Sequence, residues 1–187
     1  MLSDSTLLRD DRSSAVLSDD REYRYRLTRR WNAGEPTVAF VMLNPSTADA
    51  TEDDPTIRRC IGYAREWGYG RLVVGNLFAV RETDPANLYD YFDPVGPEND
   101  RYLQKIADEA DKVVAAWGAN GGLGDRAEHV AEDLGVDFYA LGTTQEGHPV
   151  HPLYQPADAE PEPFAYDTDR SSSNQSDNLI QNQEAEQ

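Results

Sequence analysis

TVAFVMLNPST, residues 37–47, is the stretch that decides the fold of this 187-residue chain. Residues 37–43 are almost continuously apolar, which is typical of a strand that is buried on both faces of a sheet. Asn44-Pro45-Ser46 then ends the strand, because this is turn chemistry and proline lacks a backbone N–H. The stretch therefore predicts a buried strand that delivers polar residues to one edge of a sheet.

The segment after this strand predicts a helix. Asp54 is a good N-cap, and Pro55 suits the first helical turn. Apolar residues then recur at helical spacing, and we expect a helix that ends near Trp67-Gly68. The residues expected on its buried face are Ile57, Cys60, Ile61 and Ala64.

The same alternation of strand and helix repeats downstream. The pattern predicts strands at 71–77, 113–117 and 136–141, and helices at about 98–110 and 125–134. Repeated strand–helix–strand units favour an α/β fold, here a three-layer α/β/α sandwich with a mainly parallel sheet.

The N-terminal part of the domain predicts an edge strand. From Glu22, the residues Tyr23, Tyr25 and Leu27 alternate with Arg24, Arg26 and Thr28, which is the period of a half-buried strand. Outside it, residues 1–20 lack periodicity and residues 157–187 are acidic and poor in aliphatic side chains. We therefore expect a flexible arm over 1–20, one domain over 21–156 and a disordered tail over 157–187.

Charge is the strongest compositional signal. Asp and Glu total 35 against 17 Lys and Arg, for a net charge of -18, and only two of the basic residues are lysines. Acid excess with scarce lysine is typical of a haloarchaeal type of protein, because molar salt screens the self-repulsion. Two clusters of arginine, in 21–30 and 58–71, leave a local nucleic-acid contact open despite the acidic body.

Several classes of protein are excluded by what the sequence lacks. No stretch approaches the roughly 20 apolar residues of a membrane helix, and the first residues do not resemble a signal peptide. One cysteine and three histidines cannot build a disulfide or a multi-thiolate zinc site. We therefore expect a cytoplasmic protein with no membrane partner and no cofactor.

Polar side chains follow the predicted strands. In open α/β sheets, ligands bind outside the carboxyl ends of the strands. Asparagine amides suit the edge of a nucleobase, and a histidine can donate to a carbonyl or stabilise an oxyanion. The sequence thus predicts a small polar or nucleobase-like ligand, bound by Asn44, Pro45, Ser46, Thr47, Asn76, Phe78, Trp117, Gly118, Asn120 and His151.

Each of these signals has a structural alternative. Asn44-Pro45 can be a simple turn, and Trp117 can belong to the core. The carboxylates of Asp49, Asp53 and Asp54 suit Mg²⁺, but acids are also common at a helix N-terminus. Cys60 lies on the predicted apolar helix face, where a thiol is inert.

The chain resembles a known family over about residues 21–156, the domain-of-unknown-function family 1643. The resemblance has no established activity attached to it. It rests on Tyr23-Arg24-Tyr25-Arg26-Leu27, on Phe40 to Asp49 with its Met-Leu-Asn-Pro-Ser-Thr core, on Asp54 to Cys60, on Asn76-Leu77-Phe78-Ala79 and on Asp93-Pro94 to Asp100.

A more distant similarity is to the uracil-DNA glycosylase superfamily. Asn44-Pro45, Asn76, Trp117-Gly118 and His151-Pro152 occur in the order of the motifs of that superfamily. The resemblance implies that Asn44 positions the attacking water, Asn76 recognises the base edge and His151 stabilises the developing oxyanion.

Three hypotheses follow for the function. The first is a glycosylase-like hydrolase that cleaves an N-glycosidic bond, with Asn44 and His151 as catalytic residues. The second is a non-catalytic module that binds a nucleotide or modified base in the same place. The third is magnesium-dependent phosphate chemistry through Asp49, Asp53 and Asp54.

Overall fold

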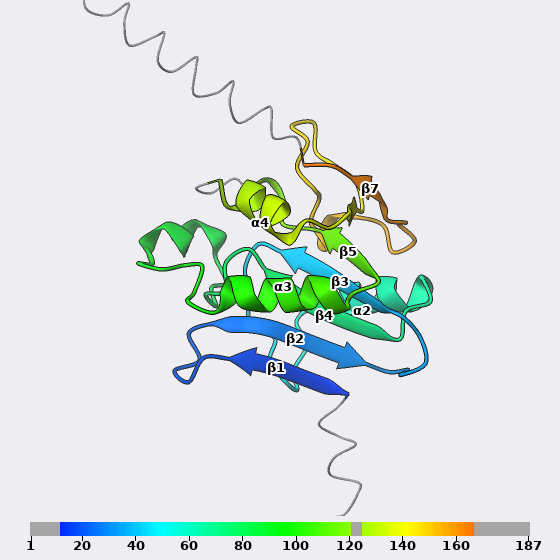
Figure 1. Ribbon diagram of the computed structural model, residues 1–187, viewed down its shortest axis with the longest axis horizontal. Coiled ribbons are helices and arrows are strands. Elements are labelled where there is room, and N and C mark those ends of the chain that lie inside the picture. Colours follow the sequence, from blue (N-terminus) through cyan, green and yellow to red (C-terminus); the bar gives the residue numbers. More distant parts are fainter. Residues whose placement is uncertain (1–11, 121–124, 167–187) are drawn as a thin grey trace, which may run out of the picture.

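The structure, a computed structural model, describes residues 12–120 and 125–166 of the chain. These residues form one seven-stranded sheet in the order β1-β2-β4-β3-β5-β6-β7 (Figure 1). The strands are β1 (Ser13–Leu17), β2 (Arg24–Arg30), β3 (Thr37–Met42), β4 (Arg71–Asn76), β5 (Lys112–Ala115), β6 (Phe138–Ala140) and β7 (Glu162–Phe164).

The sheet is mixed, so the expectation of a mainly parallel sheet was wrong. β3 runs parallel to its neighbours β4 and β5, and β5 runs parallel to β6. The outer pairs β1–β2, β2–β4 and β6–β7 are antiparallel. Apolar patterning identifies a strand but carries no information about its direction, which depends on the partner that it finds.

Helices cover both faces of this sheet. α2 (Pro55–Glu66) packs through Ile57 and Cys60 against one face, while α3 (Asn99–Glu109) and α4 (Arg126–Leu134) pack against the other. All six residues of β3 between them are buried, as the apolar run predicted. The three helices expected from periodicity are confirmed to within a residue or two at each end.

The start of α2 follows its predicted capping chemistry. The Asp54 side chain accepts a hydrogen bond from the Ile57 backbone N–H at 2.9 Å, and Pro55 occupies the first turn. Two short 3₁₀ helices complete the described elements near the carboxyl edge, η1 (Pro85–Asp90) and η3 (Pro152–Tyr154). Within the described ranges, none of the helices has the length and apolar character to cross a bilayer.

Two strands lie where the sequence predicted none. β1 falls in the expected arm over 1–20, and β7 falls in the expected tail over 157–187. Both are edge strands of partly or fully exposed residues that join the sheet through backbone hydrogen bonds. Such strands need little apolar surface, so their sequences show only a weak alternation of apolar and polar residues. β1 also makes β2 an interior strand, which corrects the prediction of an edge at 22–28; residues 1–11 and 167–187 lie outside the described residues.

A β-bulge interrupts β2. Leu17 pairs with Arg24, whereas the adjacent Val16 pairs with Arg26, so Tyr25 is an extra residue in the β2 strand. Because one extra residue reverses the alternation of side chains, the faces of β2 differ on the two sides of the bulge.

Because of the bulge, the side chains at the start of β2 point to other faces of the sheet than simple alternation predicted. Tyr25 stacks on Tyr102 of α3, with ring centroids 5.4 Å apart, while Leu27 belongs to the core on the α2 face. Arg24 is only 2% exposed, and its guanidinium reaches the loop before α2. Simple alternation had placed Arg24 with Arg26 on the solvent side of a half-buried strand.

Candidate functional site

A cavity of about 520 Å³ opens at the carboxyl-terminal edge of the parallel strands. Its walls come from the end of β3, the β4–η1 loop, the loop after β5, the first turn of α2 and η3. The start of β2 also contributes, because β2 runs antiparallel to β4 and so begins at this edge. This volume lies within the range of about 300–1,000 Å³ typical of small-ligand sites.

Most of the residues predicted from strand ends meet at this cavity. The lining includes both proposed catalytic residues and four of the proposed ligand-binding residues: Asn44, Ser46, Trp117, Gly118, Asn120 and His151. Pro45 is buried and Thr47 is exposed beside a neighbouring hollow, which also contains Arg21 and Arg81. Parallel strands end at one edge, which explains why segments so distant in sequence converge.

Asn76 and Phe78 do not line the cavity. Asn76 is 1% exposed and Phe78 is 3% exposed. The chain continues to pair with β3 beyond β4, because Leu77 N–H donates to Met42 O and Phe78 N–H donates to Leu43 O. Asn76 therefore lies inside the sheet rather than at its open end, and the expected meeting of three side chains is reduced to Asn44 and His151.

Asn44 joins two of the loops that form the cavity. Its Nδ2 donates to the backbone oxygens of Pro45 at 3.2 Å and Glu82 at 2.6 Å. The turn-forming alternative for Asn44-Pro45 is thus correct for the amide nitrogen. The amide oxygen, which can only accept, is the group that Asn44 offers to a ligand or water.

His151 occupies the N-cap of η3, and its Nδ1 accepts from the Leu153 N–H at 3.3 Å. This contact assigns the neutral tautomer with a proton on Nε2. Burial lowers the pKa of His151 below its usual value, and the nearby Asp54 carboxylate opposes that shift. At neutral pH the ring is therefore an uncharged donor at the cavity wall.

Two carboxylates line the cavity: Asp54, which the sequence offered as a helix cap or a magnesium ligand, and Glu82, which was not predicted. Asp54 uses Oδ1 to cap α2, and no hydrogen bond to its second oxygen occurs within the described part of the chain. Glu82 accepts from the Asp84 N–H at 2.9 Å and from the Tyr91 hydroxyl at 3.1 Å. The backbone hydrogen bond from Asp84 is the main reason why the pKa of Glu82 is lowered.

Arg24 is the cationic residue that sequence periodicity missed. It lines the cavity, and its Nη1 donates to the Ala48 backbone oxygen at 2.8 Å. Burial lowers the pKa of Arg24 to about 10, with Asp54 opposing the shift, so the side chain remains charged at neutral pH. Only the bulge in β2 places it here, and no single-sequence signal marks that bulge.

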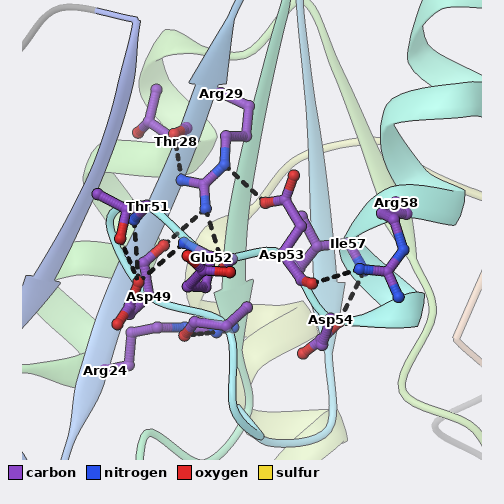
Figure 2. A network of polar contacts seen from close by, with 11 residues as sticks. Arg24, Thr28, Arg29, Asp49, Thr51, Glu52, Asp53, Asp54, Ile57 and Arg58 are labelled. Carbon is purple, nitrogen blue, oxygen red and sulfur yellow. Dashed lines mark hydrogen bonds and ion pairs between the residues drawn. The ribbon is translucent and has the colours of Figure 1, made fainter. Parts of the chain in front are cut away.

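The proposed magnesium ligands serve as loop supports instead. Figure 2 shows Arg29 reaching from β2 to the loop before α2, where it pairs with Asp53 at 2.8 Å. Asp49 Oδ1 accepts from the backbone N–H groups of Thr51 and Glu52, and Asp54 caps the helix. Among residues 12–120 and 125–166, no three His, Cys, Asp or Glu side chains gather as a metal site. Asp54 thus follows the helix N-terminus alternative, whereas Asp49 and Asp53 make contacts within and to the loop before α2.

Cys60 is also a structural residue. It is fully buried on the face of α2 that packs against the sheet, and burial raises the pKa of its thiol far above the usual range. An inert, apolar role agrees with the expectation from helical spacing.

These features define a mixed α/β protein with a ligand-sized cavity at the carboxyl edge of its parallel strands. Residues 24–153 match the family described as "Protein of unknown function (DUF1643)", and the chain belongs to this family. The matched range contains every residue that lines the cavity except Tyr154. No curated protein and no solved structure matches the chain.

Proposed function

We propose that the cavity binds a nucleobase-containing small molecule. The observation that carries this proposal is the convergence of Asn44, Asn120 and His151 on one cavity of about 520 Å³, which Trp117 also lines. Amide and imidazole groups supply both donors and acceptors, which match the mixed edge of a base. The volume accommodates a base together with a sugar.

The test is ligand-dependent thermal stabilisation. We expect nucleosides or nucleotides to raise the melting temperature of the full chain, since a ligand that binds only the folded state stabilises it. Asn120→Ala is the informative variant, because Asn120 lines the cavity and is exposed, so its loss weakens binding without disturbing the core. If no purine or pyrimidine nucleoside or nucleotide changes the melting temperature, the proposal fails.

A second candidate is hydrolysis of the N-glycosidic bond of that ligand. It is supported by the presence of an Asp54 carboxylate and a neutral His151 donor in the same cavity. In this scheme water attacks the anomeric carbon while Asn44 orients it and Asp54 accepts its proton. The carbon–nitrogen bond breaks, its electron pair goes to the departing base, and Nε2–H of His151 stabilises the resulting anion.

The glycosylase-like organisation belongs to this second candidate. Its support is the order of Asn44-Pro45, Trp117-Gly118 and His151-Pro152, and the helices on both faces of the sheet. The role of Asn76 as the reader of the base edge is dropped, because Asn76 lies outside the cavity. Nucleic acid remains a candidate substrate through Arg21 and Arg81, which line the hollow beside it.

Base release measures the catalytic candidate directly. The protein is incubated at low and high salt with nucleosides, nucleotides, and oligonucleotides that contain uracil or damaged bases. Asp54→Asn and His151→Gln are expected to lower the rate by about 10²–10⁴-fold each, the usual contribution of a general acid or base. Binding without release of base from any substrate leaves the first proposal standing and ends the second.

A further inference from the structure

Arg24 differs from the other buried arginines in having no carboxylate partner. Among the arginines that the structure describes, three are less than a tenth exposed: Arg24, Arg29 and Arg126. Arg29 pairs with Asp53, and Arg126 pairs with Asp100. Over the ranges 12–120 and 125–166, no carboxylate lies within ion-pair distance of Arg24, and its Nε has no hydrogen-bond partner.

An unpaired cation in this position is unfavourable for folding alone. Removing a guanidinium from water costs free energy that a single bond to the Ala48 carbonyl recovers only in part. Alternation without the bulge would have left Arg24 on the other face of β2, so a specific backbone irregularity holds it here. Such a cost is typical of a group kept for a ligand.

The surroundings of Arg24 favour an anion on its side of the cavity. The first turn of α2, a helix of 12 residues, contributes Thr56 and Ile57 to the same lining. Helix N-termini carry partial positive charge. Arg29 and Arg81 also act on the pKa of Arg24 and lower it, while the carboxylates of Asp54 and Asp49 act in the opposite direction.

Asp54 and Glu82 add carboxylates to the same cavity, and Asp54 is close enough to act on the charge of Arg24. Both carboxylates already accept backbone N–H groups, from Ile57 and Asp84 respectively, which offsets part of their charge. They are acceptors for hydroxyl or amine donors of a ligand, whereas Arg24 is a donor only. A ligand with an anionic end and a hydroxyl- or amine-bearing body fits this distribution.

We propose that Arg24 binds the phosphate of the ligand, so that the ligand class is a nucleoside monophosphate rather than a neutral nucleoside or free base. The proposal rests on the proposed nucleobase-binding function and deepens it by naming the anionic group. Guanidinium and phosphate form strong charge-assisted hydrogen bonds, and Arg24 lines the cavity while, among the described residues, a single hydrogen bond, to the Ala48 carbonyl, holds its guanidinium.

The experiment compares four probes by thermal shift and titration calorimetry: a nucleoside 5′-monophosphate, the same nucleoside, inorganic phosphate, and sulfate. Each is measured with the wild-type chain, Arg24→Gln, Arg24→Lys, and the matched control Arg101→Gln, which changes an exposed arginine on α3. Circular dichroism checks that each variant folds.

With the wild type, we expect the monophosphate to bind at least tenfold more tightly than the nucleoside, and inorganic phosphate to compete with it. Arg24→Gln should remove that difference, Arg24→Lys should retain part of it, and Arg101→Gln should leave it unchanged. Without ligand, Arg24→Gln should melt at the same or a higher temperature than the wild type, because an uncompensated buried charge is gone.

The outcomes separate this inference from the function on which it rests. If nucleoside and monophosphate bind the wild type equally and inorganic phosphate does not compete, Arg24 is no phosphate site while nucleobase binding stands. If phosphate and monophosphate bind through Arg24 but the nucleoside adds no affinity, the phosphate site stands and the nucleobase proposal fails. If Arg24→Gln does not fold, the affinities of the four probes for the wild type and for Arg24→Lys still test whether Arg24 binds phosphate. Equal binding of all four probes to the wild type would overturn the inference.

Discussion

At the scale of single residues, some cavity residues both stabilise the backbone and offer a polar atom to a ligand, whereas others only line the cavity. Asn44 and His151 each use one side-chain nitrogen to hold local backbone and keep a second polar atom for a ligand. Asn120, by contrast, lines the cavity as an exposed residue, and its side chain makes no hydrogen bond to the described part of the chain. Variants at these positions therefore separate stability from binding.

Asn44→Ala is expected to reduce both stability and ligand affinity. The change removes the Nδ2 contacts with Pro45 O and Glu82 O, and the lost hydrogen bonds cost about 1–2 kcal/mol of unfolding free energy. Urea denaturation measures the loss. Asn120→Ala is the control, with reduced affinity and unchanged stability, and equal stability of the two variants would contradict the anchoring role of Asn44.

His151 predicts a pH dependence of stability. Its pKa is lowered on folding from the usual 6.5, so the unfolded chain binds the proton more readily. Stability from this group is therefore complete above about pH 6.5 and falls as the pH drops through the lowered pKa. His151→Gln should flatten the pH profile of the melting temperature in this window.

His129 provides the control for that measurement, because it is exposed on α4 away from the cavity lining. His129→Gln should leave the profile as it is in the wild type. A wild-type profile that is flat between about pH 5 and 7 would contradict the burial-induced shift, since stability must then be independent of His151 protonation.

At the scale of elements, close approach of α3 to the sheet fixes the position of β4. Gly75 in β4 has no side chain, and an added Cβ would lie 2.8 Å from Leu103 Cδ2 and 2.9 Å from Ile106 Cδ1. The carboxyl end of β4 continues into the loop that carries Glu82 and Thr83 to the cavity. The spacing between α3 and β4 is therefore linked to the shape of the site.

Gly75→Ala should destabilise the protein by about 1–3 kcal/mol, the usual cost of overpacking a core. Gly62→Ala is the matched control, because Gly62 is exposed in α2 and an added Cβ meets nothing within 4 Å. Alanine there should stabilise the helix by about 0.5–1 kcal/mol. Denaturant unfolding of both variants measures whether each substitution lowers or raises the free energy of unfolding. If Gly75→Ala leaves that free energy unchanged, α3 can move away from β4 freely.

At the scale of the whole molecule, the net charge of -18 opposes the compact state. Salt is expected to stabilise the fold, since between about 0.1 M and about 1 M the Debye length shrinks from about 10 Å to about 3 Å. Thermal unfolding in increasing potassium chloride tests this, and a melting temperature that does not rise with salt would contradict salt adaptation.

Glu132→Lys with Asp133→Lys is the companion variant for the salt experiment. Both acids are exposed in the last turn of α4, where the helix dipole disfavours negative charge. The exchange should raise stability at low salt and make the salt dependence less steep. The effect should shrink at high salt, because both the dipole and the charge repulsion are screened.

The sequence by itself determined the main elements and part of the site. The apolar run at 37–43, the Asp54-Pro55 helix start and the helical spacing of apolar residues are each contained within one segment. Such patterns predict the structure of that segment from its own residues. The same logic placed Asn44 and Trp117-Gly118 just after strands, and the structure brings them to one cavity with His151, which lies at the N-cap of η3.

Only the tertiary structure decided the mixed strand directions, the edge strands β1 and β7, the interior position of Asn76 and the burial of Arg24. Each depends on a partner that is distant in sequence: β4 for the direction of β2, Leu17 and Val16 for the bulge, β3 for the residues after Asn76. Side-chain periodicity reports burial within one segment, whereas strand pairing is a property of two, so no local pattern can encode it.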